Sequence, residues 1–298
     1  MKKNLILLFA LLMCLSIFSL ETGKIYDSPV SVKLTMKISE NSAVCSDFAV
    51  TGLKPKILQK SMDYPILSLT AHDSRILAGC GDFAKIIDVE SGEEIASFSE
   101  GEIVYSMVSV SKEILLAAIQ PSGTIVRVTK QKTDTVFVSE GSSINLLKKI
   151  NNTVYAAVGN EVFVYKNSGF EKVVTVSDRN IICIEESGEY LYVSTEGIGK
   201  IIRVSLKENT QDVMFSMKSG EVLCFTVEHE KITAVVNSSL PGQEGMDQYY
   251  GLLLSIEDSN ADTIAKEDFP FSSSAKAFDG ILLAASVPGR FYYYDFKN

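Results

Sequence analysis

One pattern of short apolar strands and polar turns recurs along this chain. Each copy has an apolar strand, a second strand that ends in small residues, and two further strands joined by polar turns. The position just before the small residues is occupied in turn by Leu77, Leu116, Tyr155, Tyr192, Thr233 and Leu283. The successive separations are 39, 39, 37, 41 and 50 residues. Such a period predicts a repeat architecture in which each copy packs against its neighbours.

The turns of the repeat predict strands on either side of them. The third and fourth strands of successive copies are joined at Glu90-Ser91-Gly92, at Asn167-Ser168-Gly169 and at Asp258-Ser259-Asn260, among others. Gly and Asn accept positive φ, and Ser and Asp hydrogen-bond to the nearby backbone, as hairpin turns require. The apolar segments are short and rich in Val, Ile, Tyr and Phe, without a sustained helical period. We therefore predict an all-β chain.

A unit of about forty residues with four strands is typical of a β-propeller blade. The segment from Ala84 to Glu94 has an apolar strand, an Asp, a Ser-Gly turn and the start of a further strand. It resembles the repeats of WD-type and quinoprotein-type (PQQ-like) propellers, although the chain has no Trp. The prediction is a β-propeller of six or seven four-stranded blades, with its repeats over residues 62–298.

The blade count depends on how the ring is closed. Five complete copies begin near Ile66, Ile103, Ile144, Ile181 and Val222. The last piece supplies only three strands, so we expect an N-terminal strand to close the ring, with residues 56–59 as the donor. Residues 20–61 are expected to form N-terminal strands, a closing or partial blade, and seven blades are favoured over six.

Residues 1–19 have the features of a secretory signal peptide. Lys2 and Lys3 form a positive start, an apolar run follows over residues 5–18, and Ser19 suits the position before cleavage. The prediction is an exported protein, periplasmic or extracellular, without a transmembrane segment after the leader. A lipid anchor at Cys14 is disfavoured because the bulky Met13 stands where a small residue is needed.

Charge and cysteine content exclude several kinds of partner and site. The net charge is −9, which argues against nucleic acid as the main partner because phosphate binding needs clustered cations. No CxxC occurs and the two His lie in different segments, so a structural zinc site is not expected. No cofactor is expected either, because a quinone would need a stacking Trp and a calcium site, and the sequence shows neither. Cys183 and Cys224 have the same register in neighbouring first strands and are expected to be buried thiols. The disulfide status of Cys45 and Cys80 stays open.

The longest interval in the repeat contains a polar insertion over residues 237–250. Long loops on a rigid scaffold often carry function. Gln243 and Asp247 would supply hydrogen bonds there, and Tyr249 and Tyr250 would supply stacking area for a ligand. The alternative is a tolerated surface insertion in which the two Tyr begin the next strand.

No catalytic signature accompanies these features. Neither His72 nor His229 lies in a nucleophile motif, and the predicted first strands are mostly apolar. The sequence favours a non-enzymatic scaffold that binds a protein or peptide through one face of the ring. The alternative is a small-molecule-binding or enzymatic propeller with its site in the central channel.

Overall fold

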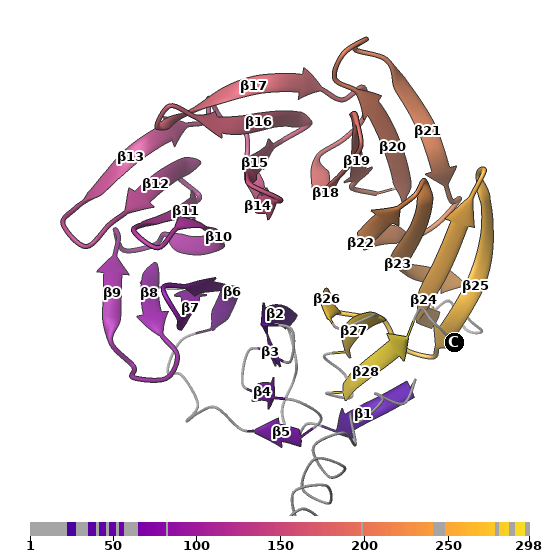
Figure 1. The fold of residues 1–298 in the computed structure, drawn as a ribbon, viewed down its shortest axis with the longest axis horizontal. Helices are drawn as coiled ribbons and strands as arrows, with labels where there is room; N and C mark the ends of the chain where they lie inside the picture. Colours follow the sequence, from indigo (N-terminus) through magenta and orange to yellow (C-terminus); the bar gives the residue numbers. More distant parts are fainter. Residues whose placement is uncertain are drawn as a thin grey trace, which may run out of the picture.

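The computed structural model describes residues 23–27, 35–39, 42–45, 48–51, 54–56, 65–81, 83–197, 199–240, 248–277, 280–285 and 290–295. These residues form seven four-stranded antiparallel sheets arranged as the blades of a ring (Figure 1). The predicted all-β propeller is therefore confirmed. Within the described ranges, no helix has the length and hydropathy that crossing a membrane would require.

Each blade runs outward from the centre of the ring. The innermost strands are β2 (Thr35–Ser39), β6 (Ile66–His72), β10 (Ile103–Ser111), β14 (Ile144–Ile150), β18 (Ile181–Ser187), β22 (Glu221–Glu228) and β26 (Ser273–Ala277). The second strands are β3 (Ser42–Cys45), β7 (Arg75–Cys80), β11 (Ile114–Gln120), β15 (Thr153–Val158), β19 (Tyr190–Thr195), β23 (Lys231–Leu240) and β27 (Gly280–Ala285).

The two outer positions of each blade complete the sheets. The third strands are β4 (Phe48–Thr51), β8 (Lys85–Asp88), β12 (Thr124–Val128), β16 (Glu161–Lys166), β20 (Lys200–Ser205), β24 (Gln248–Glu257) and β28 (Arg290–Asp295). The outermost strands are β1 (Gly23–Asp27), β5 (Lys54–Lys56), β9 (Glu94–Ser97), β13 (Thr133–Val138), β17 (Gly169–Thr175), β21 (Gln211–Ser216) and β25 (Asn260–Glu267).

The innermost strands contact one another in order around the ring, from β2 through β6, β10, β14, β18 and β22 to β26, which returns to β2. The small residues of the second strands make this close approach possible. Ala78, Ala117 and Ala156 are fully buried. A Cβ on Gly79 would lie only 2.6 Å from Cγ1 of Val104 in the next blade, so no larger residue fits there. The small-residue signature of the repeat is thus a packing requirement.

Apolar side chains fill the spaces between blades because each sheet is covered on both faces. One core cluster joins Val162 and Val174 of the β14–β17 blade to Ile184, Leu191 and Ile202 of the β18–β21 blade. Similar clusters join the other blades between β6 and β28. Burial on both faces explains why the strands read as almost continuous apolar runs.

Hydrogen bonds near the axis also link neighbouring blades. The Ser68 hydroxyl donates to the Val104 carbonyl at 3.0 Å, and the Ser194 hydroxyl donates to the Val222 carbonyl at 3.2 Å. The Asn145 amide donates to the Ile181 carbonyl at 3.2 Å. These bonds satisfy buried polar groups that would otherwise destabilise the fold.

Antiparallel pairing places the turns of every blade on two opposite faces of the ring. Turns between first and second strands, and between third and fourth strands, lie on one face, called here the turn face. Turns between second and third strands lie on the other, the connector face, together with the links between blades.

The prediction that residues 56–59 supply the strand that completes the last blade is wrong. Lys56 ends β5, which belongs to the separate β2–β5 blade, and residues 57–59 lie outside the described part of the chain. The strand that lies beside β28 is β1, whose Gly23 is the register partner of Tyr293. The strands of the β2–β5 blade have only three to five residues, so the N-terminal region carries a weak repeat signal.

Candidate functional site

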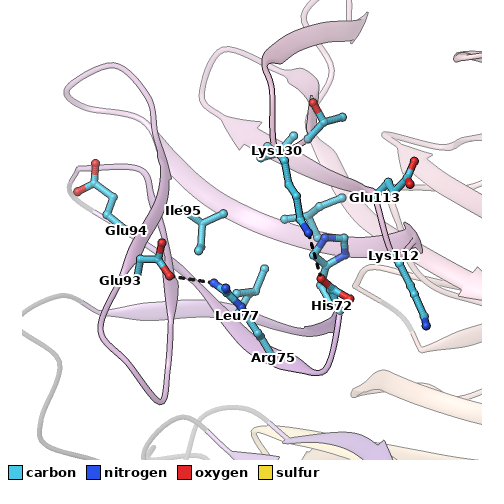
Figure 2. A pocket seen from close by; sticks show the side chains of 13 residues that line it. His72, Arg75, Leu77, Glu93, Glu94, Ile95, Lys112, Glu113 and Lys130 are labelled. Carbon is cyan, nitrogen blue, oxygen red and sulfur yellow. Dashed lines mark hydrogen bonds and ion pairs between the residues drawn. The ribbon is translucent and has the colours of Figure 1, made fainter.

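A cavity of about 330 Å³ opens on the turn face between the β6–β9 and β10–β13 blades (Figure 2). Its walls come from turns and strand ends that lie about forty residues apart in the sequence. The lining residues are His72, Asp73, Arg75, Leu77, Glu93, Glu94, Ile95, Lys112, Glu113, Leu115, Val128, Thr129 and Lys130. Both blades therefore contribute to the site.

The floor of this cavity is apolar. Leu77 and Leu115 are almost completely buried, and Val128 is buried beside them. Ile95 is a partly buried member of the same apolar cluster. An apolar group that entered the cavity and packed against the partly buried Ile95 would leave water and so gain hydrophobic free energy.

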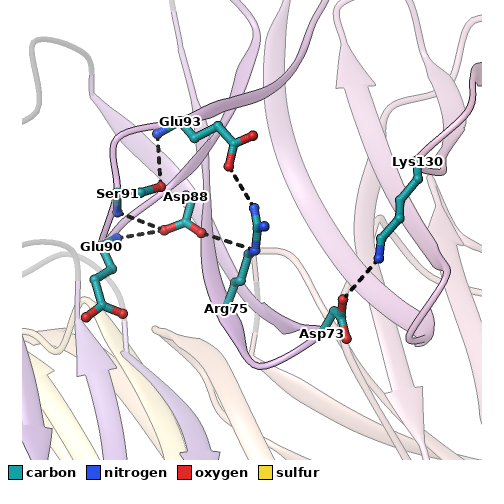
Figure 3. Close-up of polar contacts among 7 residues, drawn as sticks. All are labelled: Asp73, Arg75, Asp88, Glu90, Ser91, Glu93 and Lys130. Carbon is teal, nitrogen blue, oxygen red and sulfur yellow. Dashed lines mark hydrogen bonds and ion pairs between the residues drawn. The ribbon is translucent and has the colours of Figure 1, made fainter.

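The rim is charged with both signs. Arg75 Nη1 donates to Glu93 Oε2 at 2.9 Å, and both side chains are about half exposed. Lys130 Nζ lies 3.7 Å from Asp73 Oδ2, with the Lys130 side chain 84% exposed. Figure 3 shows the Arg75–Glu93 pair and the Asp73–Lys130 pair apart from each other. Exposed pairs of this kind contribute little to stability, so a ligand can replace either partner at low cost.

The Asp88 carboxylate organises one wall of the cavity (Figure 3). Asp88 is buried, and its Oδ1 accepts hydrogen bonds from the backbone N–H groups of Glu90 and Ser91 at 2.9 and 3.0 Å. Its Oδ2 lies 3.6 Å from Arg75 Nε. Asp88 thus fixes the β8–β9 turn and orients Arg75, which explains the Asp-x-x-Ser-Gly pattern that the sequence shows there.

His72 ends β6 and lines the cavity from the inner side. Its Nδ1 lies 3.0 Å from the Ser109 hydroxyl, and Ser109 Oγ lies 3.3 Å from the Ser111 carbonyl. The Ser109 hydroxyl can donate to only one group, and that carbonyl is a pure acceptor. We therefore assign His72 Nδ1–H as the donor to Ser109 in this network. Burial lowers the pKa of His72, although the adjacent Asp73 partly opposes this effect.

Of the residues proposed from the insertion, Tyr249 and Tyr250 lie on the opposite, connector face. Tyr249 and Tyr250 follow Gln248 at the start of β24, whose hairpin with β23 is built from the two longest strands among those described. Tyr249 is 59% exposed, and Lys266 Nζ lies 4.6 Å from the ring centroid of Tyr250. Gln243 and Asp247 lie outside the described residues.

The connector face anchors the base of this hairpin. The Ser238 hydroxyl donates to the Ser219 carbonyl at 2.9 Å, and the Ser219 hydroxyl donates to the Ser239 carbonyl at 3.4 Å. The two Tyr rings thus project from a fixed base. Their binding role stays a prediction.

Sequence reasoning missed the turn-face cavity because its walls belong to different repeats. A usable signal existed in the alignment of copies, where His72-Asp73 and Lys112-Glu113 occupy neighbouring positions of successive first turns. Leu77 and Leu115, which form the floor, also come from successive second strands. When charged residues in the first turns and apolar residues in the second strands recur in adjacent copies, they indicate a cavity between two blades with an apolar floor and a charged rim.

The described part of the chain shows neither a disulfide nor a cluster of side chains that could bind a metal ion. Cys80, Cys183 and Cys224 are free, and burial raises the pKa of Cys80 to about 11 and that of Cys224 to about 12. Within the same ranges, no three His, Cys, Asp or Glu side chains lie close enough together to hold a metal ion.

No family profile matches the sequence, and no curated protein is detectably similar to it. Solved structures are similar in fold at low identity. The extracellular domain of the putative one component system BT4673 from B. thetaiotaomicron is 12% identical with a TM-score of 0.66, over 93% of this chain and 40% of that one. BamB from Moraxella catarrhalis is 9% identical with a TM-score of 0.60, over 92% and 99% of the two chains.

A WD40 domain gives a similar result. The WD40 domain of Neurospora crassa Pan2 is 12% identical, with a TM-score of 0.61 and 89% of each chain covered. These likenesses show the fold alone: the chain is a β-propeller, as these structures are.

Proposed function

We propose that this protein is an exported propeller scaffold that binds a protein or peptide, and that the turn-face cavity is its binding site. The observation that carries the proposal is the apolar floor of Leu77, Ile95 and Leu115 beneath a rim of weakly held ion pairs. This arrangement suits an apolar anchor side chain whose polar neighbours pair with the rim.

The size of the cavity supports a side-chain anchor rather than a large cofactor. A volume of about 330 Å³ lies at the small end of the range for ligand pockets, about 300–1,000 Å³. Binding energy in protein interfaces concentrates in a few buried anchor residues that fill such pockets. Lys112 and Lys130 on the rim would then select the charge of the flanking segment.

The proposal of export depends on the leader at residues 1–19. Among the structures with this fold, one is described as an extracellular domain. A propeller scaffold outside the cytoplasm is consistent with both observations.

The test compares four versions of the chain that starts at Leu20, each immobilised as bait for exported proteins. The pocket variant carries Lys112→Glu and Lys130→Glu. The matched control carries Lys166→Glu and Lys231→Glu, which change the charge equally on the same face but outside the cavity. The loop variant lacks residues 240–248.

We expect a partner that the parent and the matched control retain and the pocket variant loses. Retention by the pocket variant at the parent's level would overturn the proposed site. Loss from the loop variant alone would place binding on the connector face, near Tyr249 and Tyr250. Peptide scanning of the captured protein would then identify the bound segment.

A further inference from the structure

A second cavity of about 300 Å³ lies on the turn face of the β18–β21 blade. Its walls come from the β18–β19 turn and the β20–β21 turn. The lining residues are Glu186, Gly188, Glu189, Tyr190, Leu206 and Lys207. It shares no residue with the cavity between the β6–β9 and β10–β13 blades.

Glu186 lines this cavity and has one unsatisfied carboxylate oxygen. Its Oε2 is buried and has no hydrogen-bond partner among the described residues. The Glu186 carboxylate also contributes, after burial, to raising the pKa of the neighbouring Tyr155 to about 12. A buried carboxylate oxygen without a donor is costly, so a ligand that supplies one gains more than an ordinary hydrogen bond.

The other walls fit an alkyl chain that ends in a cation. Leu206 is 44% exposed and offers apolar area at the mouth. Tyr190 offers an aromatic ring that already accommodates one cation, since Arg203 Cζ lies 4.8 Å from its centroid. A Cβ on Gly188 would meet no atom within 4 Å, so this part of the turn borders open space.

The charge of the cavity favours a positive ligand. Glu186 and Glu189 are acidic, and Lys207 is the single basic residue among those that line it. Glu189 is exposed on the β18–β19 turn. A cation would therefore meet two carboxylates and be opposed by the exposed Lys207 ammonium. The Arg203 guanidinium beside the Tyr190 ring is already paired with Asp212.

We propose that this cavity binds a primary alkylammonium group, such as a lysine side chain of a polypeptide. The ammonium donates to Glu186 Oε2 and lies near Glu189, and its methylene stem packs against Leu206 and Tyr190. This site is independent of the proposed function, but it lies on the same face, where a single partner protein can reach both cavities.

The test uses two small probes and backbone-amide NMR spectra of the chain that starts at Leu20. Nα-acetyl-lysine methylamide is the ligand probe, and Nα-acetyl-norleucine methylamide has a similar apolar stem without the charge. The lysine probe should shift the amide signals of residues 186–190 and 205–208, and the norleucine probe should leave them unchanged. Equal shifts with both probes, or none with either, would overturn the proposal.

Two substitutions with opposite effects sharpen this test. Glu186→Gln keeps an acceptor for Tyr155 but removes the charge, and should weaken lysine binding about fivefold. Lys207→Gln removes the opposing ammonium and should strengthen it. Glu230→Gln, on the first turn of the next blade, is the matched control and should change nothing.

Further outcomes separate this site from the first cavity. If Glu186→Gln fails to fold, as a thermal melt would reveal, Glu189→Gln tests the same charge at an exposed position. The variant with Lys112→Glu and Lys130→Glu should bind the lysine probe like the parent. Unchanged affinity in both Glu variants would refute the inference and leave the proposed function intact.

Discussion

Lys148 Nζ donates to Glu185 Oε1 at 2.8 Å across the gap between two blades. The two residues occupy equivalent positions of neighbouring innermost strands, since Lys148 pairs in register with Tyr155 and Glu185 with Tyr192. Burial alone would lower the pKa of Lys148, but the nearby Cys183 and Glu185 outweigh it and raise the pKa. The ion pair therefore remains charged and joins the two blades near the axis.

Removal of one partner of this ion pair should destabilise the fold. We expect Lys148→Met to lower the free energy of unfolding by about 1–3 kcal/mol, because the Glu185 carboxylate, 19% exposed, loses its partner. Lys148→Met combined with Glu185→Leu should cost less than the sum of the single changes. Urea unfolding followed by circular dichroism measures all three variants.

An exposed ion pair is the control for this measurement. Lys172 and Glu161 lie 2.8 Å apart, but the Lys172 side chain is 52% exposed, so Lys172→Met should cost less than about 1 kcal/mol. If Lys148→Met and Lys172→Met lower the free energy of unfolding equally, the Lys148–Glu185 pair stabilises the fold no more than an exposed pair does.

Substitutions of Asp88 should separate its two roles. Asp88→Asn keeps an oxygen that accepts from the Glu90 and Ser91 N–H groups, and should cost little because Arg75 is half exposed. Asp88→Ala leaves both donors without this acceptor and should lower the free energy of unfolding by about 1–3 kcal/mol. The measurement is chemical denaturation of the two variants in parallel. A larger loss with Asn than with Ala would contradict the assigned turn role.

Stability should depend on pH through His72. Burial lowers the pKa of His72 below its ordinary value of 6.5, so the folded state prefers the neutral ring. The resulting stability is present above pH 6.5 and is lost as the pH falls through the lowered pKa. His72→Gln should remove this part of the pH dependence. Melting temperatures of parent and variant from pH 7.5 to 5 test it, and parallel curves would count against it.

The thiols of the buried Cys80 and Cys183 and of the partly buried Cys224 should resist alkylation while the protein is folded. Burial raises the pKa of Cys80, Cys183 and Cys224, so little thiolate is present at pH 8. In a chain with Cys45→Ser that starts at Leu20, iodoacetamide should label these three residues slowly before unfolding and fully in guanidinium. Mass spectrometry counts the labels, and rapid labelling of the folded chain would contradict the predicted protection.

Much of the fold follows from the repeat because one packing rule acts in every blade. The six positions that precede the small residues of the second strands all pair with third strands. Leu77 pairs with Asp88, Leu116 with Arg127 and Leu283 with Tyr292. Predicted first strands at Ile66, Ile103, Ile144 and Ile181 begin at those residues. Small residues at one position, required by the neighbouring blade, make the period visible in the sequence.

The candidate site could not be predicted in the same way. Its floor and rim combine residues of two repeats. A rim charge such as Lys130 becomes part of the cavity only because the β6–β9 blade, which carries its partner Asp73, lies beside it. The strand next to β28 was misplaced for a related reason. Its partner comes from the far end of the described chain, and no local pattern in Gly23–Asp27 identifies it.

The pairing of β1 with β28 has a kinetic consequence. Gly23 meets Tyr293 only after 270 further residues have been made and moved to the place of folding. Pairings this distant in sequence form slowly, because the entropy cost of closing a long loop comes before the free energy gained from the contacts. The blade that holds β1 and β28 is therefore expected to form last, and until then β1 is an exposed strand that other chains can capture. A chaperone that covers Gly23–Asp27 until this blade has formed would protect the protein from such capture.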